Sequence, residues 1–233
     1  ILPSRPKESA EAYSEVWLPE GSPLIVTSQQ QADVLQKQLD DIPVELAMRY
    51  QNPSIEDAVD RLLAEGIEQV VILPLFPHYA MSSYESALVK AEKVMAKKAP
   101  QVKIEVVPPF YDDVEFIDSM VASSSDYLSE GYDHILFSFH GLPERHLRKS
   151  DPTGEHCLSC ENCCEGDHPA HKTCYRAQCY KTVEAYAKRA GVPKEQYSVS
   201  FQSRLGRDPW LKPYTDFVAV SYTHLRAHET CHN

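Results

Sequence analysis

The sequence predicts an α/β protein in which helices cover parallel β-sheets. Short apolar runs without polar alternation recur along the chain, as expected for strands that are buried on both faces. Between these runs lie segments with helical spacing, each about 10–17 residues long. Strands that alternate with helices indicate βαβ units, and 233 residues are enough for one or two domains.

The first part of the chain alternates in this way up to a pair of prolines. We expect strands at residues 24–28, 44–50, 70–76 and 102–107. We expect helices at residues 29–39, 55–65 and 83–97, the second opened by Ser54 and Asp57 as a capping box. Pro108 and Pro109 interrupt the pattern, so we place a domain boundary near residues 108–112.

The second part repeats the pattern around a long irregular segment. We expect a helix from residue 110 to about 130 and a strand at 134–139. Residues 150–173 show no periodicity and are predicted to form a loop. A helix at 175–190, ended by Gly191, and a strand at 197–202 follow.

Composition and charge exclude several classes of protein. The formal net charge is −11, from 23 Lys and Arg against 34 Asp and Glu, which disfavours nucleic acids and anionic membranes as partners. No run reaches the ~18 apolar residues of a membrane-spanning helix, and no signal peptide opens the chain, so we expect a cytoplasmic protein. The chain does not start with Met, so we expect its natural N-terminus to be missing.

Two histidines follow predicted strands directly. His78 comes after the run at 70–76, and His140 comes after the run at 134–139 and before Gly141. Ligands of open α/β sheets bind beyond the carboxyl ends of strands, where an imidazole can bind a metal or take up a proton. His140 is the stronger candidate because a sharp turn follows it, although either side chain can simply stabilise a loop.

Six of the seven cysteines lie within residues 157–179. Cys157, Cys160 and Cys163 have CxxCxxC spacing, with Cys164 adjacent and Cys174 beyond. Closely spaced thiolates favour zinc or an iron–sulfur cluster over hard cations. Zinc would also accept His168 or His171, whereas a cluster prefers four cysteines. We expect Cys179, within the following helix, to be an ordinary buried thiol.

Four segments resemble the ferrochelatases, the enzymes that insert ferrous iron into a porphyrin. The segment Phe137–Pro143 (FSFHGLP) is similar to their signature. In order and spacing, the other similar segments are 47–54 (AMRYQNPS), 73–79 (LPLFPHY) and 201–216 (FQSRLGRDPWLKPYTD). The resemblance covers about residues 1–217.

The resemblance implies two Rossmann-like, chelatase-type domains, at 1–109 and 110–217, with a porphyrin cleft between them. It implies that His140 is the catalytic residue, which binds the incoming iron or accepts a pyrrole proton. Arg5, Tyr13, Ser22 and Tyr79 are implied porphyrin contacts. The substrates would be Fe²⁺ and protoporphyrin IX or coproporphyrin III. Other tetrapyrrole chelatases and a non-catalytic metal- or redox-sensing protein are the alternatives.

Some members of that family hold a [2Fe–2S] cluster through an internal cysteine-rich insertion. The resemblance therefore favours a [2Fe–2S] cluster over Zn²⁺ in the loop at 150–174, with a structural or redox-sensing role. The candidate ligands are Cys157, Cys160, Cys163, Cys164 and Cys174. Contact with a membrane surface remains compatible with the sequence.

The last residues do not resemble the family. We expect residues 218–233 to be a non-native tail, so that Glu229, Cys231 and His232 have no role in a site. The second domain would then be incomplete and lack the acidic partner of His140. We accordingly expect the chain as written to be poorly soluble and nearly inactive as an enzyme.

Overall fold

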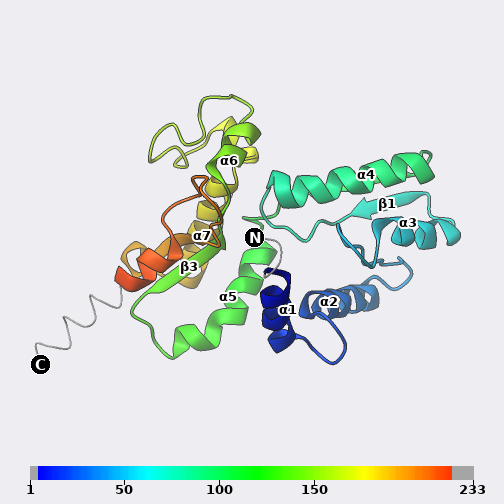
Figure 1. The fold of residues 1–233 in the computed structure, drawn as a ribbon, viewed down its shortest axis with the longest axis horizontal. Helices are drawn as coiled ribbons and strands as arrows, with labels where there is room; N and C mark the ends of the chain where they lie inside the picture. The colour runs from blue at the N-terminus through cyan, green and yellow to red at the C-terminus, as the bar shows by residue number, and fades with distance from the viewer. Residues whose placement is uncertain (1–4, 222–233) are drawn as a thin grey trace, which may run out of the picture. The chain divides into compact units, whose positions relative to one another are not determined.

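The computed structural model describes residues 5–221 as two compact units (Figure 1). The first comprises the residues up to Val70 together with Val89–Glu105, and the second comprises Val71–Leu88 and the residues from Val106 onward. Helices alternate with strands in both, and the strands form two two-stranded sheets, β1–β2 and β3–β4. The predicted α/β class with parallel sheets is therefore confirmed.

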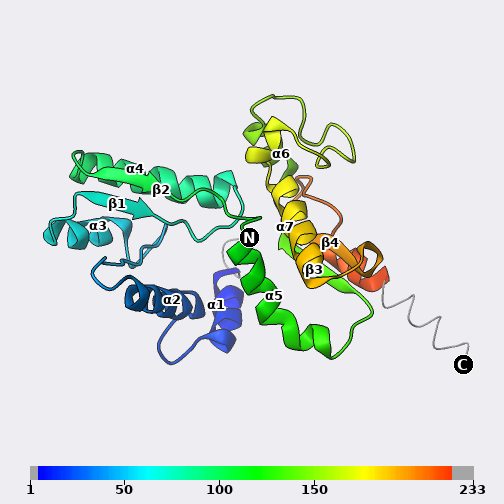
Figure 2. The ribbon, with the colours of Figure 1, turned by 180° about the vertical axis from the view of Figure 1, so that it is seen from behind.

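The first sheet pairs β1 (Gln69–Ile72) with β2 (Lys103–Val106). Backbone bonds from Lys103 N to Glu68 O and from Val107 N to Ile72 O advance in the same direction along both strands, as in a parallel pair. Figures 1 and 2 show α3 (Ile55–Ala64) and α4 (Ser86–Lys98) beside this sheet. Apolar side chains of these two helices, namely Ile55, Val59, Val94 and Met95, form one core with Ala99, which follows α4.

Two predicted strands of the first unit are wrong. Residues 24–28 belong to helix α2 (Pro23–Leu39), because Pro23 supplies a first-turn φ and the helical spacing continues from it without a break. Residues 44–50 are irregular, since the side chain of Gln36 bonds Val44 N at 2.8 Å and no strand lies alongside. The strand expected at 70–76 ends at Ile72, because Pro74 has no N–H to continue the ladder.

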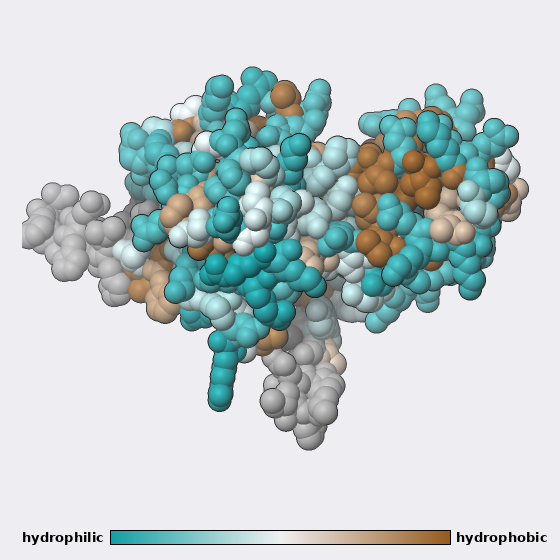
Figure 3. Space-filling model, turned by 90° about the horizontal axis from the view of Figure 1, so that it is seen from above, coloured by the Kyte–Doolittle hydropathy of each residue, from teal (hydrophilic) through white to brown (hydrophobic). Residues whose placement is uncertain are grey.

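Other expectations for this part are confirmed. The Ser54 side chain accepts a hydrogen bond from Asp57 N at 3.0 Å, which caps α3 as predicted. Helix α4 follows a π-helical turn, η1 (Met81–Glu85), within the helix expected at 83–97. Helix α1 (Arg5–Val16) precedes α2. Figure 3 shows hydrophobic residues on the surface of the part that carries α4 and β1, where exposed apolar side chains include Val71, Leu73 and Val89.

The second unit is organised by a parallel pair, β3 (Ile135–His140) and β4 (Tyr197–Gln202). Residues pair in register from Ile135 with Tyr197 to His140 with Gln202. Helix α7 (Tyr175–Ala190) and β4 contribute Ala177, Cys179, Val183 and Phe201 to the buried core of this unit. Helix α5 (Val114–Ser129) packs against α7.

Most sequence predictions for this unit are confirmed. Helix α7 and strand β4 have the predicted bounds, and Gly191 ends α7 with φ +72°, a left-handed conformation that glycine adopts without strain. Cys179 is fully buried, as expected. The segment 150–173 is irregular apart from a single 3₁₀ turn, η2 (Pro169–Lys172). The short helix α6 (Glu144–Ser150) was not expected.

The end of the chain is only partly described. Residues 215–221 are helical, and Val218 N bonds Tyr214 O at 3.1 Å. Glu229, Cys231 and His232 lie outside the described residues. Within residues 5–221, none of the helices combines the length and the apolar character needed to cross a bilayer.

Candidate active site

The His140 side chain is exposed at the carboxyl end of β3. Its strand partner is Gln202, and the next amide, Gly141 N, donates to Gln202 O at 2.7 Å. The Trp210 ring lies edge-on to the imidazole, with ring centroids 6.5 Å apart. The predicted candidate therefore lies at a sheet edge, where a ligand can reach it.

The turn after His140 is tied to the segment that follows β4. A side-chain carbon on Gly141 would lie 2.8 Å from Gln202 O, which leaves room only for glycine. Leu211 N donates to Leu142 O at 3.0 Å, and Glu144 N donates to Pro209 O at 2.9 Å. Two of the segments singled out in the sequence, 137–143 and 201–216, thus form one structural element.

Tyr175, the first residue of α7, holds the other side of His140. Its hydroxyl donates to His140 O at 3.0 Å. Burial raises the pKa of Tyr175, so the hydroxyl keeps its proton and remains a donor. The sequence analysis did not find this residue, because nothing local to it signals a bond to a carbonyl 35 residues away.

His78 is an interior histidine in the same unit. Its Nε2 lies 2.9 Å from the Thr182 hydroxyl, which itself donates to Tyr111 O at 2.6 Å. The imidazole packs edge-on against the rings of Phe139 and Tyr175, at 5.4 and 5.6 Å. Burial lowers the pKa of His78 to about 4, so the ring is neutral at pH 7. These contacts identify a packing role for His78.

Tyr79 is fixed through its backbone. Its amide donates to the buried Gln178 side chain at 2.6 Å. Burial, together with a hydrogen bond to Glu85, raises the pKa of Tyr79 to about 12 and keeps the phenol neutral. The half-buried ring lies 6.0 Å from that of Tyr84.

The other three predicted porphyrin contacts belong to the first unit. Arg5 is the first residue of α1, and its side chain is outside what the structure describes. Tyr13, on the same helix, is 65% exposed. Ser22 is half-buried at the N-cap position of α2, and its hydroxyl makes no capping bond there. Their role in binding stays a prediction.

A buried carboxylate organises the cysteine-rich loop. Asp151 accepts hydrogen bonds from Cys157 N, His156 N and Thr153 at 2.7–2.8 Å. Burial opposes the charge on Asp151, but these hydrogen bonds outweigh it and hold its pKa below the usual range. The loop is therefore anchored just before the first cysteine.

Three of the predicted ligands converge. The thiols of Cys157 and Cys164 both hydrogen-bond to Cys174. These bonds, with burial, raise the pKa of Cys157 and of Cys164, and they lower that of Cys174. Cys163 is also buried, with its Sγ 3.3 Å from Leu158 N, but Cys160 is exposed.

The ligand set is incomplete as a coordination shell. Within residues 5–221, no three His, Cys, Asp or Glu side chains are arranged around one point as metal ligands. The histidines of the loop make other contacts, because His156 and His171 both reach Cys163 O, at 2.7 and 2.8 Å, and His168 accepts from Ala170 N. The loop therefore brings several cysteine thiols together, but in the described residues they do not form a complete coordination site.

Known proteins match nearly the whole chain. A model of the ferrochelatase family matches residues 1–228. The chain is 49% identical over 217 residues to a ferrochelatase of Stutzerimonas stutzeri and 48% identical to one of Ectopseudomonas mendocina, covering 93% of this chain and 64% of each relative. The chain belongs to the ferrochelatase family. A ferrochelatase of Opitutus terrae is 45% identical and is covered over 63% of its length.

The extent of the match bears on the ends of this ferrochelatase-family chain. The chain spans about 64% of the length of the curated relatives it matches. The family match reaches residue 228, within the segment 218–233 that is expected to be a non-native tail. That expectation stays a prediction.

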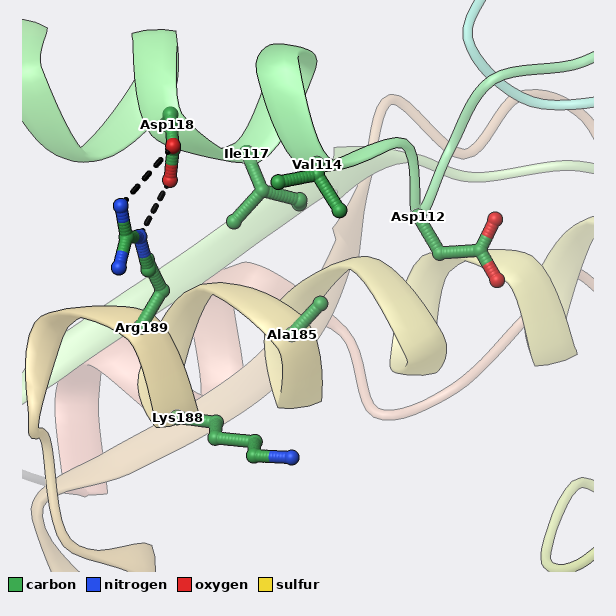
Figure 4. A pocket seen from close by; sticks show the side chains of 7 residues that line it. All are labelled: Asp112, Val114, Ile117, Asp118, Ala185, Lys188 and Arg189. Carbon is green, nitrogen blue, oxygen red and sulfur yellow. Dashed lines mark hydrogen bonds and ion pairs between the residues drawn. The ribbon is translucent and has the colours of Figure 1, made fainter.

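A depression on this ferrochelatase-family chain is lined by side chains of α5 and α7 and by Asp112. The depression lies between α5 and α7 (Figure 4). Its main charged pair, Asp118 and Arg189, is joined by hydrogen bonds that lower the pKa of Asp118. Arg189 is 14 residues beyond Tyr175, which is about 21 Å along the helix. The Arg189 end of the depression is therefore distant from Tyr175 along α7.

Proposed function

We propose that this chain carries the iron-inserting site of a ferrochelatase, with His140 as its catalytic residue. The observation that supports this most is the exposed imidazole at the carboxyl end of β3, whose backbone is held by Gln202 and Tyr175. The substrates are Fe²⁺ and a porphyrin, and the product is haem.

The chemistry matches what an imidazole at this position does. Metallation removes two N–H protons from the porphyrin and replaces water around Fe²⁺ with four pyrrole nitrogens. An imidazole nitrogen can bind either a proton or divalent iron, so His140 accepts a pyrrole proton or delivers the metal. The proton then passes to solvent, since the His140 side chain is exposed.

Four residues are assigned to porphyrin binding in this proposal. In this proposal Arg5 pairs with a propionate, Tyr13 and Tyr79 cover the ring, and Ser22 donates a hydrogen bond. The exposure of Tyr13 and the neutral phenol of Tyr79 support these roles. Protoporphyrin IX and coproporphyrin III differ in their number of carboxylates. Measuring the affinity of each porphyrin for Arg5→Leu and for the parent chain therefore tests the pairing of Arg5 with a propionate.

Iron insertion is tested by following the loss of free-porphyrin absorption under anaerobic conditions. Two proteins are assayed. One is the chain as written, and the other is a joined protein, in which the chain is fused to the segments that flank the matched region in the Stutzerimonas stutzeri relative. We expect insertion by the joined protein and a loss of at least 100-fold in His140→Ala. Insertion at the parent rate by His140→Ala would exclude His140 as the catalytic residue.

The cysteine-rich loop would hold a [2Fe–2S] cluster, with Zn²⁺ as the alternative. The soft, mostly buried donor set supports this, with Cys157, Cys164 and Cys174 already in contact and Cys160 or Cys163 as the fourth ligand. Bound there, the cluster would supply a structural or redox-sensing centre. It has no part in iron insertion.

Metal content separates the alternatives. A [2Fe–2S] protein is coloured and contains iron and acid-labile sulfide, whereas a zinc protein is colourless. Cys174→Ala is expected to lose the metal, and Cys179→Ala, a buried thiol on the same helix, is the matched control that keeps it. Purified protein without iron, sulfide or zinc would refute both assignments.

The proposed location is the cytoplasm, with contact to a membrane surface. The exposed side chains of Tyr13, Val16 and Trp17 support such contact, because aromatic rings favour the interfacial region. Cosedimentation with phosphatidylcholine vesicles is expected for the parent chain and not for Trp17→Ser. Equal cosedimentation of the two would contradict the assignment.

A further inference from the structure

Helix α7 directs a row of polar side chains at the elements that carry the candidate site. Tyr175, Gln178 and Thr182 are spaced i, i+3 and i+7, which places them on one face of the helix. Their partners are His140 O, Tyr79 N and the His78 ring, respectively. One helix face therefore holds the segments that carry His78 and His140.

Gln178 keeps this face in place. The side chain is fully buried, and its Oε1 accepts from Tyr79 N while its Nε2 donates to Lys172 O and His171 O, at 2.9 and 3.2 Å. A buried amide with all these bonds formed resists displacement, because each unmade bond leaves a buried polar group unsatisfied. The first turns of α7 thus have a fixed position against both the Tyr79 segment and the end of the cysteine-rich loop.

Tyr175 acts on His140 from that fixed position. The bond from its hydroxyl reaches the carbonyl of His140 itself, at the last residue of β3. On the other side of the same peptide unit, Gly141 N is bonded to Gln202 O. The peptide plane that follows His140 is therefore held at both its oxygen and its nitrogen, which restrains the backbone from which the imidazole projects.

We propose that Tyr175 is the positioning residue of His140 and that its hydroxyl sets the rate of iron insertion without contacting porphyrin or iron. The inference rests on the proposed function of His140. Tyr175→Phe removes only this hydroxyl, so it frees one side of the peptide plane and leaves the ring packing against His78 in place.

The matched control is Tyr186→Phe, the same change on the same helix. The Tyr186 hydroxyl bonds the Ser124 side chain of α5 and has no bond to the site. Both variants lose the hydrogen bonds of one tyrosine hydroxyl, which for Tyr175 include a contact with the Cys179 side chain, and both are expected to lower the thermal midpoint. Only the variant that faces His140 is expected to slow insertion.

Two measurements test the proposal. In the joined protein, Tyr175→Phe is expected to lower kcat about 3- to 10-fold with an unchanged KM for porphyrin, the effect of one ordinary hydrogen bond, while Tyr186→Phe keeps the parent kcat. In the chain as written, hydrogen exchange of residues 138–142 is expected to rise in Tyr175→Phe alone.

Each result supports or overturns either the positioning role of Tyr175 or the proposed function of His140. An unchanged kcat in Tyr175→Phe, an equal loss in Tyr186→Phe, or unchanged exchange at 138–142 in Tyr175→Phe would overturn the positioning role. Activity of His140→Ala at the parent level would instead overturn the proposed function. In that case the exchange measurement still tells whether Tyr175 holds the end of β3.

Discussion

Substitution of Gly141 by alanine tests the close contact that shapes the turn after His140. The added methyl carbon would lie 2.8 Å from Gln202 O, with Trp210 Cε3 and Phe201 Cβ at 3.5 and 3.6 Å. Real side-chain carbons almost never approach a backbone oxygen so closely, so the end of β4 has to move. Movement of β4 also lengthens the 2.7 Å bond from Gly141 N to Gln202 O.

The expected cost combines two effects. Insertion of a methyl group into a packed site costs about 1–3 kcal/mol, and loss of the hydrogen bond costs about 1 kcal/mol. We therefore expect the free energy of unfolding to fall by about 2–4 kcal/mol. The control is Gly154→Ala, where the added methyl group meets no atom within 4 Å. Its only cost is that of a side chain at φ +76°, about 1–2 kcal/mol.

The assay is urea unfolding followed by Trp210 fluorescence in a Trp17→Phe background, because the added methyl group would lie 3.5 Å from Trp210 Cε3. Gly141→Ala is expected to unfold at a lower urea concentration than Gly154→Ala, with a similar slope. A Gly141→Ala protein as stable as its parent, or more stable than Gly154→Ala, would refute the close-contact argument.

Two further predictions concern buried ionisable groups. Folding holds the pKa of His78 near 4 against 6.5 in the unfolded chain, so the contribution of His78 to stability is full above pH 6.5 and falls by about 3 kcal/mol as the pH drops to 4. In His78→Phe, the difference between the urea midpoints at pH 7 and pH 4.5 should therefore be smaller than in the parent. An unchanged pH dependence would contradict this. The pKa of Asp151 is lowered, so its contribution is present above about pH 4 and is lost in acid. Asp151→Asn is expected to lower the free energy of unfolding by about 1–3 kcal/mol and to speed the reaction of Cys157 with a thiol reagent. A Cys157 that reacts as slowly as in the parent would show that the carboxylate does not organise the loop.

Local patterns were enough to predict α7, β3 and β4 of the second unit. Helix α7 has regular spacing and a glycine stop, and β3 and β4 are continuous apolar runs, so propensity and tertiary structure agree. His140 was found because a histidine between an apolar run and a glycine marks a strand end in sequence.

The first unit shows where such patterns fail. The run at residues 24–28 is apolar and β-branched, but Pro23 and the helical spacing that follows it favour α2. Residues 44–50 have strand-like composition without a neighbouring strand to bond, and composition alone cannot supply a partner.

Tertiary contacts explain what the sequence analysis missed at the site. Tyr175 and Gln178 act through bonds to residues 35 and 99 positions away, and no local spacing announces such pairs. The same holds for His78, whose strand-end position indicated chemistry while its bond to Thr182 indicates packing.

The rate of iron insertion by His140→Ala, with porphyrin binding measured on the same sample, tests the central claim most directly. An exposed imidazole that only moves protons or iron can be removed without unfolding the sheet edge, since Gly141 and Gln202 remain bonded through their backbones. We predict unchanged porphyrin affinity and an insertion rate at least 100-fold lower. An insertion rate within threefold of the parent would contradict the account.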